Sequence, residues 1–288
     1  MANRKQEAGR DALAVKGWWR SYRWLLLRRL CQVMVLALFL CGSWSGVWIL
    51  HGNYSSSLLL DTVPLSDPLM VLQSLASGHL PATLALSGAL IVGGFYALAG
   101  RRLFCSWVCP VNPLTDLAAW LRRRLGITAS ASLPRWLRYL ILALVLAGSL
   151  LTGSLLWEWV NPVSIAGRGL IFGFGAGIFL LLALFLFDLL VVEHGWCGHL
   201  CPLGAFYGLT GGAGALGVTA AGRERCTRCM DCFHVCPEPQ VLRAPVLDKQ
   251  SPARIAGRDC MTCGRCVDVC AEEVFKITIR WSSGAKDE

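Results

Sequence analysis

Charge is scarce in this chain. Only 16% of its 288 residues are charged, whereas 55% are hydrophobic, and this balance is unusual for a soluble protein. The sequence contains no CxxCH motif, which excludes a covalently attached c-type haem. No nucleic-acid-binding motif accompanies the net charge of +9, and the basic residues flank apolar runs. We therefore expect no nucleic-acid partner, and we expect a membrane protein.

The hydrophobic residues gather in four runs of membrane-spanning length, for which about 20 apolar residues suffice. We expect an α-helical membrane protein with four transmembrane helices arranged as two repeated pairs. The first run follows a long basic tail and has the length of a span, so we expect an anchor and not a cleaved signal peptide. The expected spans cover residues 30–50, 80–99, 139–160 and 169–192.

Lys and Arg are distributed unevenly around these runs. Residues 1–29 hold eight of them and residues 101–138 hold seven, whereas residues 51–79 hold none. By the positive-inside rule both termini lie in the cytoplasm and residues 51–79 form an outward loop. We therefore expect a multi-pass protein of the bacterial inner (cytoplasmic) membrane. Residues 112–125 predict a short helix, either in the membrane interface or as a cytoplasmic connector.

The composition divides the chain into four parts. We expect a basic cytoplasmic tail over residues 1–29 and a four-helix transmembrane domain over residues 30–209. Glycine-rich residues 210–222 indicate a linker. Residues 223–288 contain eight of the fourteen cysteines, and they predict a small cytoplasmic two-cluster ferredoxin-like α+β domain.

Two cysteine runs in this last part, CTRCMDCFHVCP and DCMTCGRCVDVC, share the spacing C-x2-C-x2-C-x3-C. Bacterial two-cluster ferredoxins have this spacing, and the fourth cysteine of each run binds the other cluster. Structural zinc usually pairs C-x2-C units over a longer gap, and disulfides are not expected in the cytoplasm. The expected [4Fe–4S] ligands are Cys226, Cys229, Cys232 and Cys270 for cluster 1, and Cys260, Cys263, Cys266 and Cys236 for cluster 2.

A shorter pattern, C-x3-C-P, occurs twice, in FCSWVCP and in CGHLCP, each time after an apolar run. Residues i and i+4 share one face of a helix, so each pair can converge on one ligand. Two packed pairs offer four thiolates for a third iron–sulfur centre, for copper or zinc, or for dithiol redox chemistry. Inert buried cysteines are the remaining alternative. The candidate metal ligands are Cys105, Cys109, Cys197 and Cys201.

Clusters of this kind carry single electrons, so their fusion to a membrane domain predicts electron exchange with a quinone. Quinol oxidation also releases two protons and needs polar acceptors near the ring. A carboxylate inside a membrane is costly and indicates function. The tentative quinol site is Asp188, Glu193 and His194, and an alternative group on the outer side is His51, Asp61, His79 and Glu158.

The chain resembles the NapH family of ferredoxin-type membrane proteins over essentially its whole length. The resemblance is carried by GWWRSYRWLLLRRLCQ, LHGNYSSSLL, QSLASGHLPAT, WEWVNPVS and LFDLLVVEHGWCGHLCP, together with the cysteine motifs. A wider class that includes NosR and CcoG-like proteins shares the four spans, the two C-x3-C-P motifs and the ferredoxin tail.

The resemblance implies a quinol dehydrogenase component that takes electrons from quinol. It implies a NapG-like periplasmic ferredoxin as partner, with electrons passing to a periplasmic nitrate reductase, in some cases through a multihaem cytochrome. Two alternatives stay open. One is a copper-handling or oxidase-assembly protein that uses the four C-x3-C-P thiols, and the other is a non-redox membrane anchor for a periplasmic ferredoxin. The expected topology leaves about 30 Å of hydrocarbon between the clusters and the periplasm.

Overall fold

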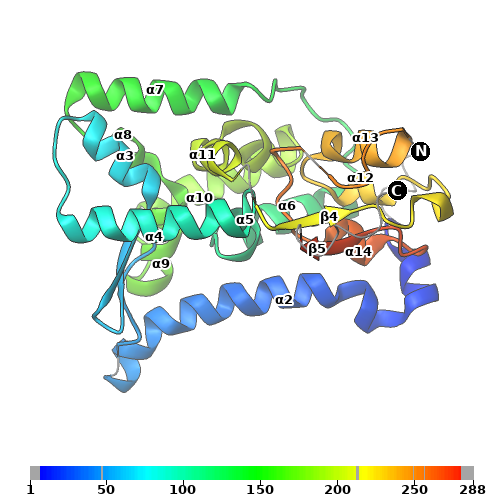
Figure 1. The fold of residues 1–288 in the computed structure, drawn as a ribbon, viewed down its shortest axis with the longest axis horizontal. Coiled ribbons are helices and arrows are strands. Elements are labelled where there is room, and N and C mark those ends of the chain that lie inside the picture. The colour runs from blue at the N-terminus through cyan, green and yellow to red at the C-terminus, as the bar shows by residue number, and fades with distance from the viewer. Residues whose placement is uncertain (1–6, 47, 212–213, 249, 256, 280–288) are drawn as a thin grey trace.

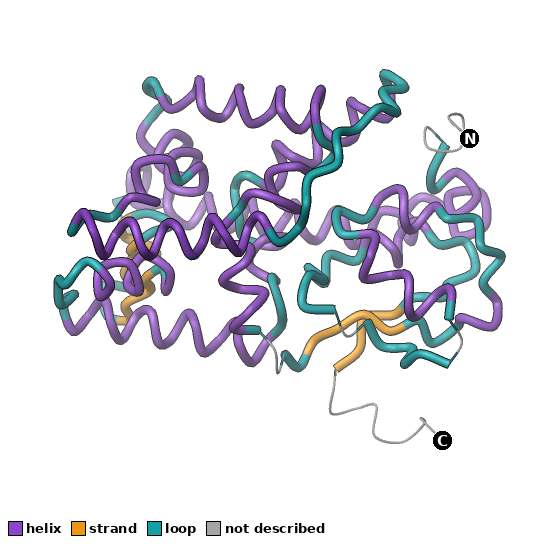
Figure 2. The backbone as a smooth tube through the Cα atoms, turned by 90° about the horizontal axis from the view of Figure 1, so that it is seen from above, coloured by secondary structure: helices purple, strands orange, loops and turns teal. Residues whose placement is uncertain are grey.

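The computed structural model describes residues 7–46, 48–211, 214–248, 250–255 and 257–279. Figure 1 shows a larger helical part on the left and a smaller part of short helices and strands on the right. Each part has its own hydrophobic core, one around Trp157 and Tyr207 and the other around Leu242 and Val274. Figure 2 shows that the two small sheets are well separated, one in each part of the molecule.

The first apolar run lies in α2, Arg10–Ser45. Among the described residues, α2 is the one helix that is long and apolar enough to cross a membrane. Gly17 interrupts the helix with a φ of 76°, a left-handed value that glycine adopts at little cost. The segment around this kink packs against α14, Arg265–Val269, in the small part. The described part of the expected basic tail therefore packs on the small part. Residues 1–6 of the tail lie outside the described range.

Residues 51–79, expected as an outward loop, contain mostly strands and a helix. Three antiparallel strands lie in the order β1-β2-β3, and helix α3 follows them. Asn53 closes the first turn by accepting hydrogen bonds from the N–H groups of Ser55 and Ser56, and Asp67 caps α3 by accepting from Leu69 N–H. The elements are β1 Leu50–Gly52, β2 Ser56–Leu59, β3 Val63–Ser66 and α3 Pro68–Ala76.

The second and third expected spans contain shorter helices than the sequence suggested. Helix α4 covers Thr83–Ala99, close to the expected bounds. Helix α7 covers Leu137–Thr152 and ends at Gly153, whose φ is 64°. The rest of the third run forms a separate helix, α8, Leu156–Val160. Glycine stops α7 because it accepts the left-handed conformation that ends many helices.

The fourth expected span was wrong as a single helix. Its first residues belong to α9, Pro162–Phe172, which ends at Gly173 with a φ of 98°. A second helix, α10, covers Gly177–Leu186 and continues as the π-helical turn η1, Phe187–Val191. The apolar helices other than α2 are 10–17 residues long, which is below the ~20 residues of a typical span.

Both C-x3-C-P motifs lie in short helical turns that follow an apolar helix. After α4 come α5, Leu103–Trp107, and α6, Asn112–Arg124. After η1 come the π-helical turn η2, Trp196–Leu200, and α11, Pro202–Thr210. The repeat of architecture therefore extends through the motifs to the helices that follow them.

The small part is built around a two-stranded antiparallel sheet of β4, Leu216–Thr219, and β5, Lys276–Ile279. Strand β4 lies inside the expected linker, so that expectation was wrong for these residues. The glycine-rich composition concealed a strand whose Val218 is buried in the core of the small part. Its remaining elements are η3 Arg223–Arg225, α12 Asp231–Val235, η4 Pro239–Leu242, α13 Arg243–Leu247 and α14.

Candidate functional site

The two ferredoxin-type cysteine runs fold into loops with the same backbone geometry. Arg228 and Thr262 are both left-handed, and each lies two residues after the first cysteine of its run. Met230 and Gly264 are also left-handed, and each directly follows the second cysteine. A short helix, α12 or α14, then carries the third cysteine. The two runs are therefore structural repeats as well as sequence repeats.

The loops bring together the two sets of thiols that the spacing suggested. Cys232 interacts electrostatically with Cys270, Cys229 and Cys226, which complete the first set. Burial first, and these neighbours second, raise the pKa of the Cys232 thiol to about 12. Four thiols that oppose one another's ionisation fit a metal centre, because its positive charge deprotonates coordinating thiols. The second set shows the same grouping, since Cys266 interacts with Cys263, Cys236 and Cys260.

The two C-x3-C-P pairs also converge, although they are far apart in the sequence. Cys109 interacts with Cys105 and with Cys201, and Cys197 interacts with Cys201 and Cys109. Three of these four side chains are buried. The four thiols therefore form a third group between the repeated halves. Across the described ranges, no three His, Cys, Asp or Glu side chains converge on the position of a single metal ion. A four-iron cluster binds each thiolate at a different iron, so its ligands lie further apart than those of one ion.

Hydrogen bonds join the first C-x3-C-P loop to the loop that carries Cys260 and Cys263. Ser106 Oγ donates to Met261 O at 2.8 Å, and Trp107 Nε1 donates to Thr262 O at 3.2 Å. Both acceptors lie between the two cysteines of the second ferredoxin run. The third thiol group is therefore fixed next to the cluster 2 set.

A buried carboxylate, Glu238, connects the second C-x3-C-P loop to the same set. Glu238 Oε1 is 2.5 Å from Arg102 Nη1 and 2.6 Å from Arg138 Nη1, and all three side chains are at most 2% exposed. Arg102 also donates to Cys197 O at 2.6 Å, and Arg138 donates to the adjacent carbonyl at 3.1 Å. Because Glu238 lies two residues after Cys236, these bonds hold the two loops in register.

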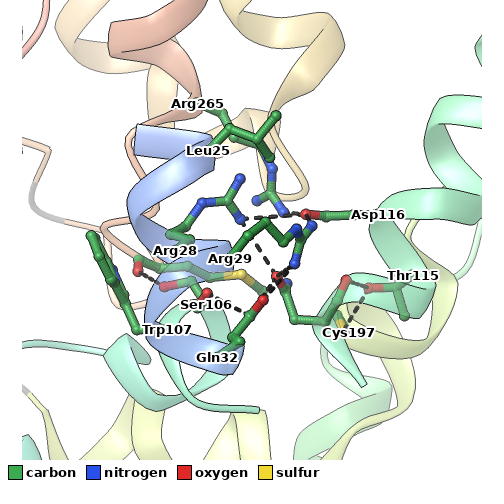
Figure 3. Close-up of polar contacts among 12 residues, drawn as sticks. Leu25, Arg28, Arg29, Gln32, Ser106, Trp107, Thr115, Asp116, Cys197 and Arg265 are labelled. Carbon is green, nitrogen blue, oxygen red and sulfur yellow. Dashed lines mark hydrogen bonds and ion pairs between the residues drawn. The ribbon is translucent and has the colours of Figure 1, made fainter. Parts of the chain in front are cut away.

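A second, partly buried ionic group joins α2, α6 and the small part (Figure 3). Asp116 on α6 pairs with Arg29 on α2 and with Arg265 on α14, and Arg28 Nη1 lies 3.3 Å from its Oδ2. Burial alone would raise the pKa of Asp116, but the three guanidinium groups hold it well below its usual range. Sequence reasoning missed these residues because it treated the arginines only as markers of the cytoplasmic side.

The tentative quinol residues do not form one cluster. The Asp188 carboxylate is buried and accepts a hydrogen bond from Trp196 N–H at 2.9 Å. Glu193 lies beside residue 130, where its backbone N–H donates to Ser130 Oγ at 3.2 Å. Of the three, only His194 lines the large cavity beside Asp116 and Arg265.

The alternative outer group also separates into distinct contacts. His51 Nδ1 lies 3.2 Å from Asp61 Oδ1 on the exposed strands. Glu158 pairs with Arg168 at 2.9 Å, and His79 lies beside Ser77 at 3.3 Å. Glu158 also accepts hydrogen bonds from Ser55 and Ser164, so these four residues take part in separate local interactions.

Comparison with known proteins assigns the thiol-bearing segments. A family model described as a 4Fe-4S binding domain matches twice, over residues 81–128 and 173–219, and each match contains one C-x3-C-P motif. A model described as a 4Fe-4S dicluster domain matches residues 220–271. The chain is thus a ferredoxin-type protein with iron–sulfur domains.

Relatives that match along nearly the whole chain show its family. The chain is 71% identical to ferredoxin-type protein NapH of Escherichia coli (strain K12), over 99% of this chain and 100% of that protein. It is 55% identical to NapH of Haemophilus influenzae, over 98% of each chain. It is 48% identical to the methylamine utilization ferredoxin-type protein MauN of Methylorubrum extorquens, over 95% of each. No solved structure matches. The chain belongs to the NapH family, which confirms the resemblance seen in the sequence.

Proposed function

We propose that the chain is a membrane quinol dehydrogenase component that passes electrons through three iron–sulfur centres. The observation that carries this proposal is the continuity of the three thiol groups. The C-x3-C-P group is hydrogen-bonded to the Cys260–Cys263 loop, and Cys266 of that set also interacts with Cys232 of the other set. Iron–sulfur clusters held by these thiols would carry single electrons along this line.

We further propose that the third group is an iron–sulfur site. It lies in the two segments that match the 4Fe-4S binding model, and its thiols interact electrostatically with one another, as do those of each ferredoxin set. The order of centres would then be the C-x3-C-P group, cluster 2 and cluster 1. Glu238 and its arginines would keep the first two in fixed register.

We propose that α2, α4, α7 and the α9–α10 pair cross the bacterial inner membrane, with the small part in the cytoplasm. In support, these helices expose large apolar side chains, among them Leu30 at 64%, Leu90 at 76% and Phe179 at 72%. Exposed apolar surface on this scale is rare in soluble monomers. We propose the same domains as the sequence suggested, which are residues 1–29, 30–209 and 223–288. Strand β4, which lies in the expected linker (residues 210–222), then belongs to the ferredoxin-like domain.

We propose that the electrons pass to a NapG-like periplasmic ferredoxin and on towards a periplasmic nitrate reductase, with a multihaem cytochrome as a possible intermediate. Membership of the NapH family supports this direction of flow. The relatives named MauN belong to methylamine utilization, so the terminal acceptor is the least specific element of the proposal.

The test uses the full chain, purified without oxygen in detergent with its clusters intact. A decyl-chain benzoquinol and a menaquinol analogue are added, and cluster reduction is followed by EPR. We expect reduction in the wild type, loss of one cluster signal in Cys263→Ser, and no change in Cys31→Ser, which lies outside all three sets. If dithionite reduces the clusters but neither quinol does, the proposal fails. Stoichiometric copper binding by the C-x3-C-P thiols would then favour metal handling.

A further inference from the structure

A cavity of about 830 Å³ opens between α2, α6 and the ferredoxin-like part. Ligand pockets for small molecules commonly measure ~300–1,000 Å³ and combine apolar walls with a few polar groups. Leu25, Pro113 and Val235 contribute to the apolar walls, and Arg28, Asp116 and His194 are among the polar residues. The size and lining therefore suit a ring of moderate polarity.

One side of the cavity mouth is apolar and faces outward, whereas exposed Glu7, Arg10 and Arg124 make the rest of the mouth charged. Leu13, Tyr22, Leu117 and Trp120 line this apolar rim and are each between 37% and 50% exposed. A polar interior behind an apolar rim fits an amphiphile whose headgroup enters while its hydrocarbon tail stays outside. The rim is formed by α2 and α6, and α6 is the helix that the sequence predicts either in the membrane interface or as a cytoplasmic connector.

The inner wall of the cavity adjoins the cysteine sets. Val235, Arg265 and Val269 line it, and they are the chain neighbours of Cys236, Cys266 and Cys270 respectively. Residues beside both proposed clusters therefore bound the same space. A redox-active headgroup placed there would lie next to its electron acceptors.

His194 supplies a free hydrogen-bonding group at this wall. It is 5% exposed, and its Nε2 has no hydrogen-bond partner in the described part of the chain. Burial first, and Arg265 second, lower the pKa of His194 to about 3. The imidazole is therefore neutral at physiological pH, and Nε2 can accept a hydrogen bond when the ring proton is on Nδ1.

We propose that this cavity binds the quinol headgroup, with His194 accepting a hydrogen bond from one quinol hydroxyl and the arginines around Asp116 facing the other oxygen. This inference rests on the proposed function and gives it a location. Oxidation of one quinol breaks two O–H bonds, yields one quinone, and releases two electrons and two protons. The electrons pass singly to the adjacent iron–sulfur sites, and both protons leave to water on the charged side of the mouth, beside Glu7 and Arg10.

The charges favour a quinol over the phosphate of an anionic lipid. The arginines Arg28, Arg29 and Arg265 already share the Asp116 carboxylate. Nearer the mouth, Arg10 pairs with Glu7 at 2.7 Å and the Arg124 guanidinium lies over the Trp120 ring. A phosphate placed among them would compete with that buried anion, whereas a neutral ring can accept hydrogen bonds from the arginines without displacing it. Phospholipid retention is therefore a distinguishable outcome of the test.

The experiment measures quinone binding to the intact protein by photolabelling and by titration. A decyl-chain azidobenzoquinone should label residues 22–29 or 113–124. Leu117→Trp narrows the mouth, and Leu125→Trp is the matched control, because Leu125 follows α6, is 60% exposed and does not line the cavity. We expect Leu117→Trp to weaken binding about tenfold or more and Leu125→Trp to leave it unchanged.

His194→Asn tests the hydrogen bond, because asparagine tolerates the left-handed backbone at this position. We expect about tenfold weaker quinone binding, and no change in His51→Gln at the outer end. Labels on residues 48–66 or 158–168 would overturn the inference, and so would loss of bound phospholipid from Leu117→Trp with unchanged quinone binding. If quinol reduces the wild type and both cavity variants equally, the cavity inference fails alone. If it reduces none of them, the proposed function fails.

Discussion

Arg102 and His194 occupy equivalent positions in the two repeated halves, and they serve different ends. Each lies three residues before the first cysteine of a C-x3-C-P motif, each has a left-handed backbone, and each is buried. Arg102 pairs with Glu238 and fastens the ferredoxin-like part. His194 has an unpartnered nitrogen and lines the cavity. The duplicated loop thus keeps one backbone geometry for thiol presentation, while its entry residue is specialised differently in each half.

The largest expected effect tests whether the C-x3-C-P motifs of the two repeated halves bind one shared iron–sulfur centre. Replacing Cys105 and Cys109 with serine should remove a whole cluster, and replacing Cys197 and Cys201 should remove the same one. Iron and acid-labile sulfide analysis should then fall from about twelve irons per chain to about eight in either variant. The combined four-cysteine variant should lose no more.

The control for this test replaces Cys31 and Cys41, which belong to none of the three groups. Their replacement should leave the iron content unchanged. Additive losses from the two pairs would show two separate centres. A wild-type count that stays near eight irons, with all four thiols open to alkylation, would show that they hold none.

The next test removes the ion pair by which Arg102 of the first half holds the ferredoxin-like part. Glu238→Gln leaves buried Arg102 without its anion and Arg138 with Asp259 alone, and breaking a buried pair typically costs about 3–5 kcal/mol. Denaturant unfolding of the cluster-loaded protein should show a loss of that size. Asp61→Asn, in the exposed pair with His51, should change the unfolding free energy by less than about 1 kcal/mol. Equal effects from the two variants would contradict a special role for Glu238.

The spacing of the cysteines predicts the two ferredoxin sets, because each loop follows from local chain geometry. The structure brings the thiols of each set near one another, and their binding of clusters stays a prediction. The spacing also predicted that four more thiols could meet. The partners of the buried charges were beyond reach, since Arg102 and Glu238 are 136 residues apart and nothing in the sequence pairs them. Composition could not show that Gly173 divides the fourth apolar run into two helices. It also could not show that a strand lies within the glycine-rich linker.

Asp188 shows a further limit of sequence reasoning. A carboxylate within an apolar run predicts a proton-transfer role, but it could not show that Asp188 Oδ1 accepts from Trp196 N–H at the entry to the second thiol loop. Asp188 Oδ2 is buried and has no hydrogen-bond partner among the described residues. His194, six residues on, was identified together with Asp188. The cavity beside His194 is lined by α2 and α14, which come from opposite ends of the chain. Only the fold could therefore show that His194 lines this cavity and that Asp188 does not.

A smaller effect should distinguish the two ferredoxin loops, which share one backbone but differ in their neighbours. A Cβ atom on Gly264 would lie 2.5 Å from Trp24 Cγ, and its φ of 74° also disfavours a side chain. Gly264→Ala should therefore cost about 1–3 kcal/mol and increase hydrogen exchange in residues 10–25. Met230→Ala at the equivalent position should cost less than about 1 kcal/mol. Unchanged exchange in Gly264→Ala would show that α2 does not depend on this contact.

The smallest expected effect is on the reduction potential of the centre at the two C-x3-C-P loops. In these loops Arg102 faces the Cys105 thiol and Thr115 faces the Cys197 thiol. Thr115 Oγ1 is 3.7 Å from Cys197 Sγ and 3.1 Å from Asn112 O, so one hydroxyl proton can serve either acceptor. Hydrogen bonds to cluster sulfurs are among the factors that set reduction potential. Thr115→Val should therefore lower the potential of the third centre in a redox titration, while the unfolding free energy changes by only about 1 kcal/mol. Thr115→Ser keeps the hydroxyl and should keep the wild-type potential. If serine lowers the potential as much as valine does, the methyl packing of Thr115 matters and its hydrogen bond does not.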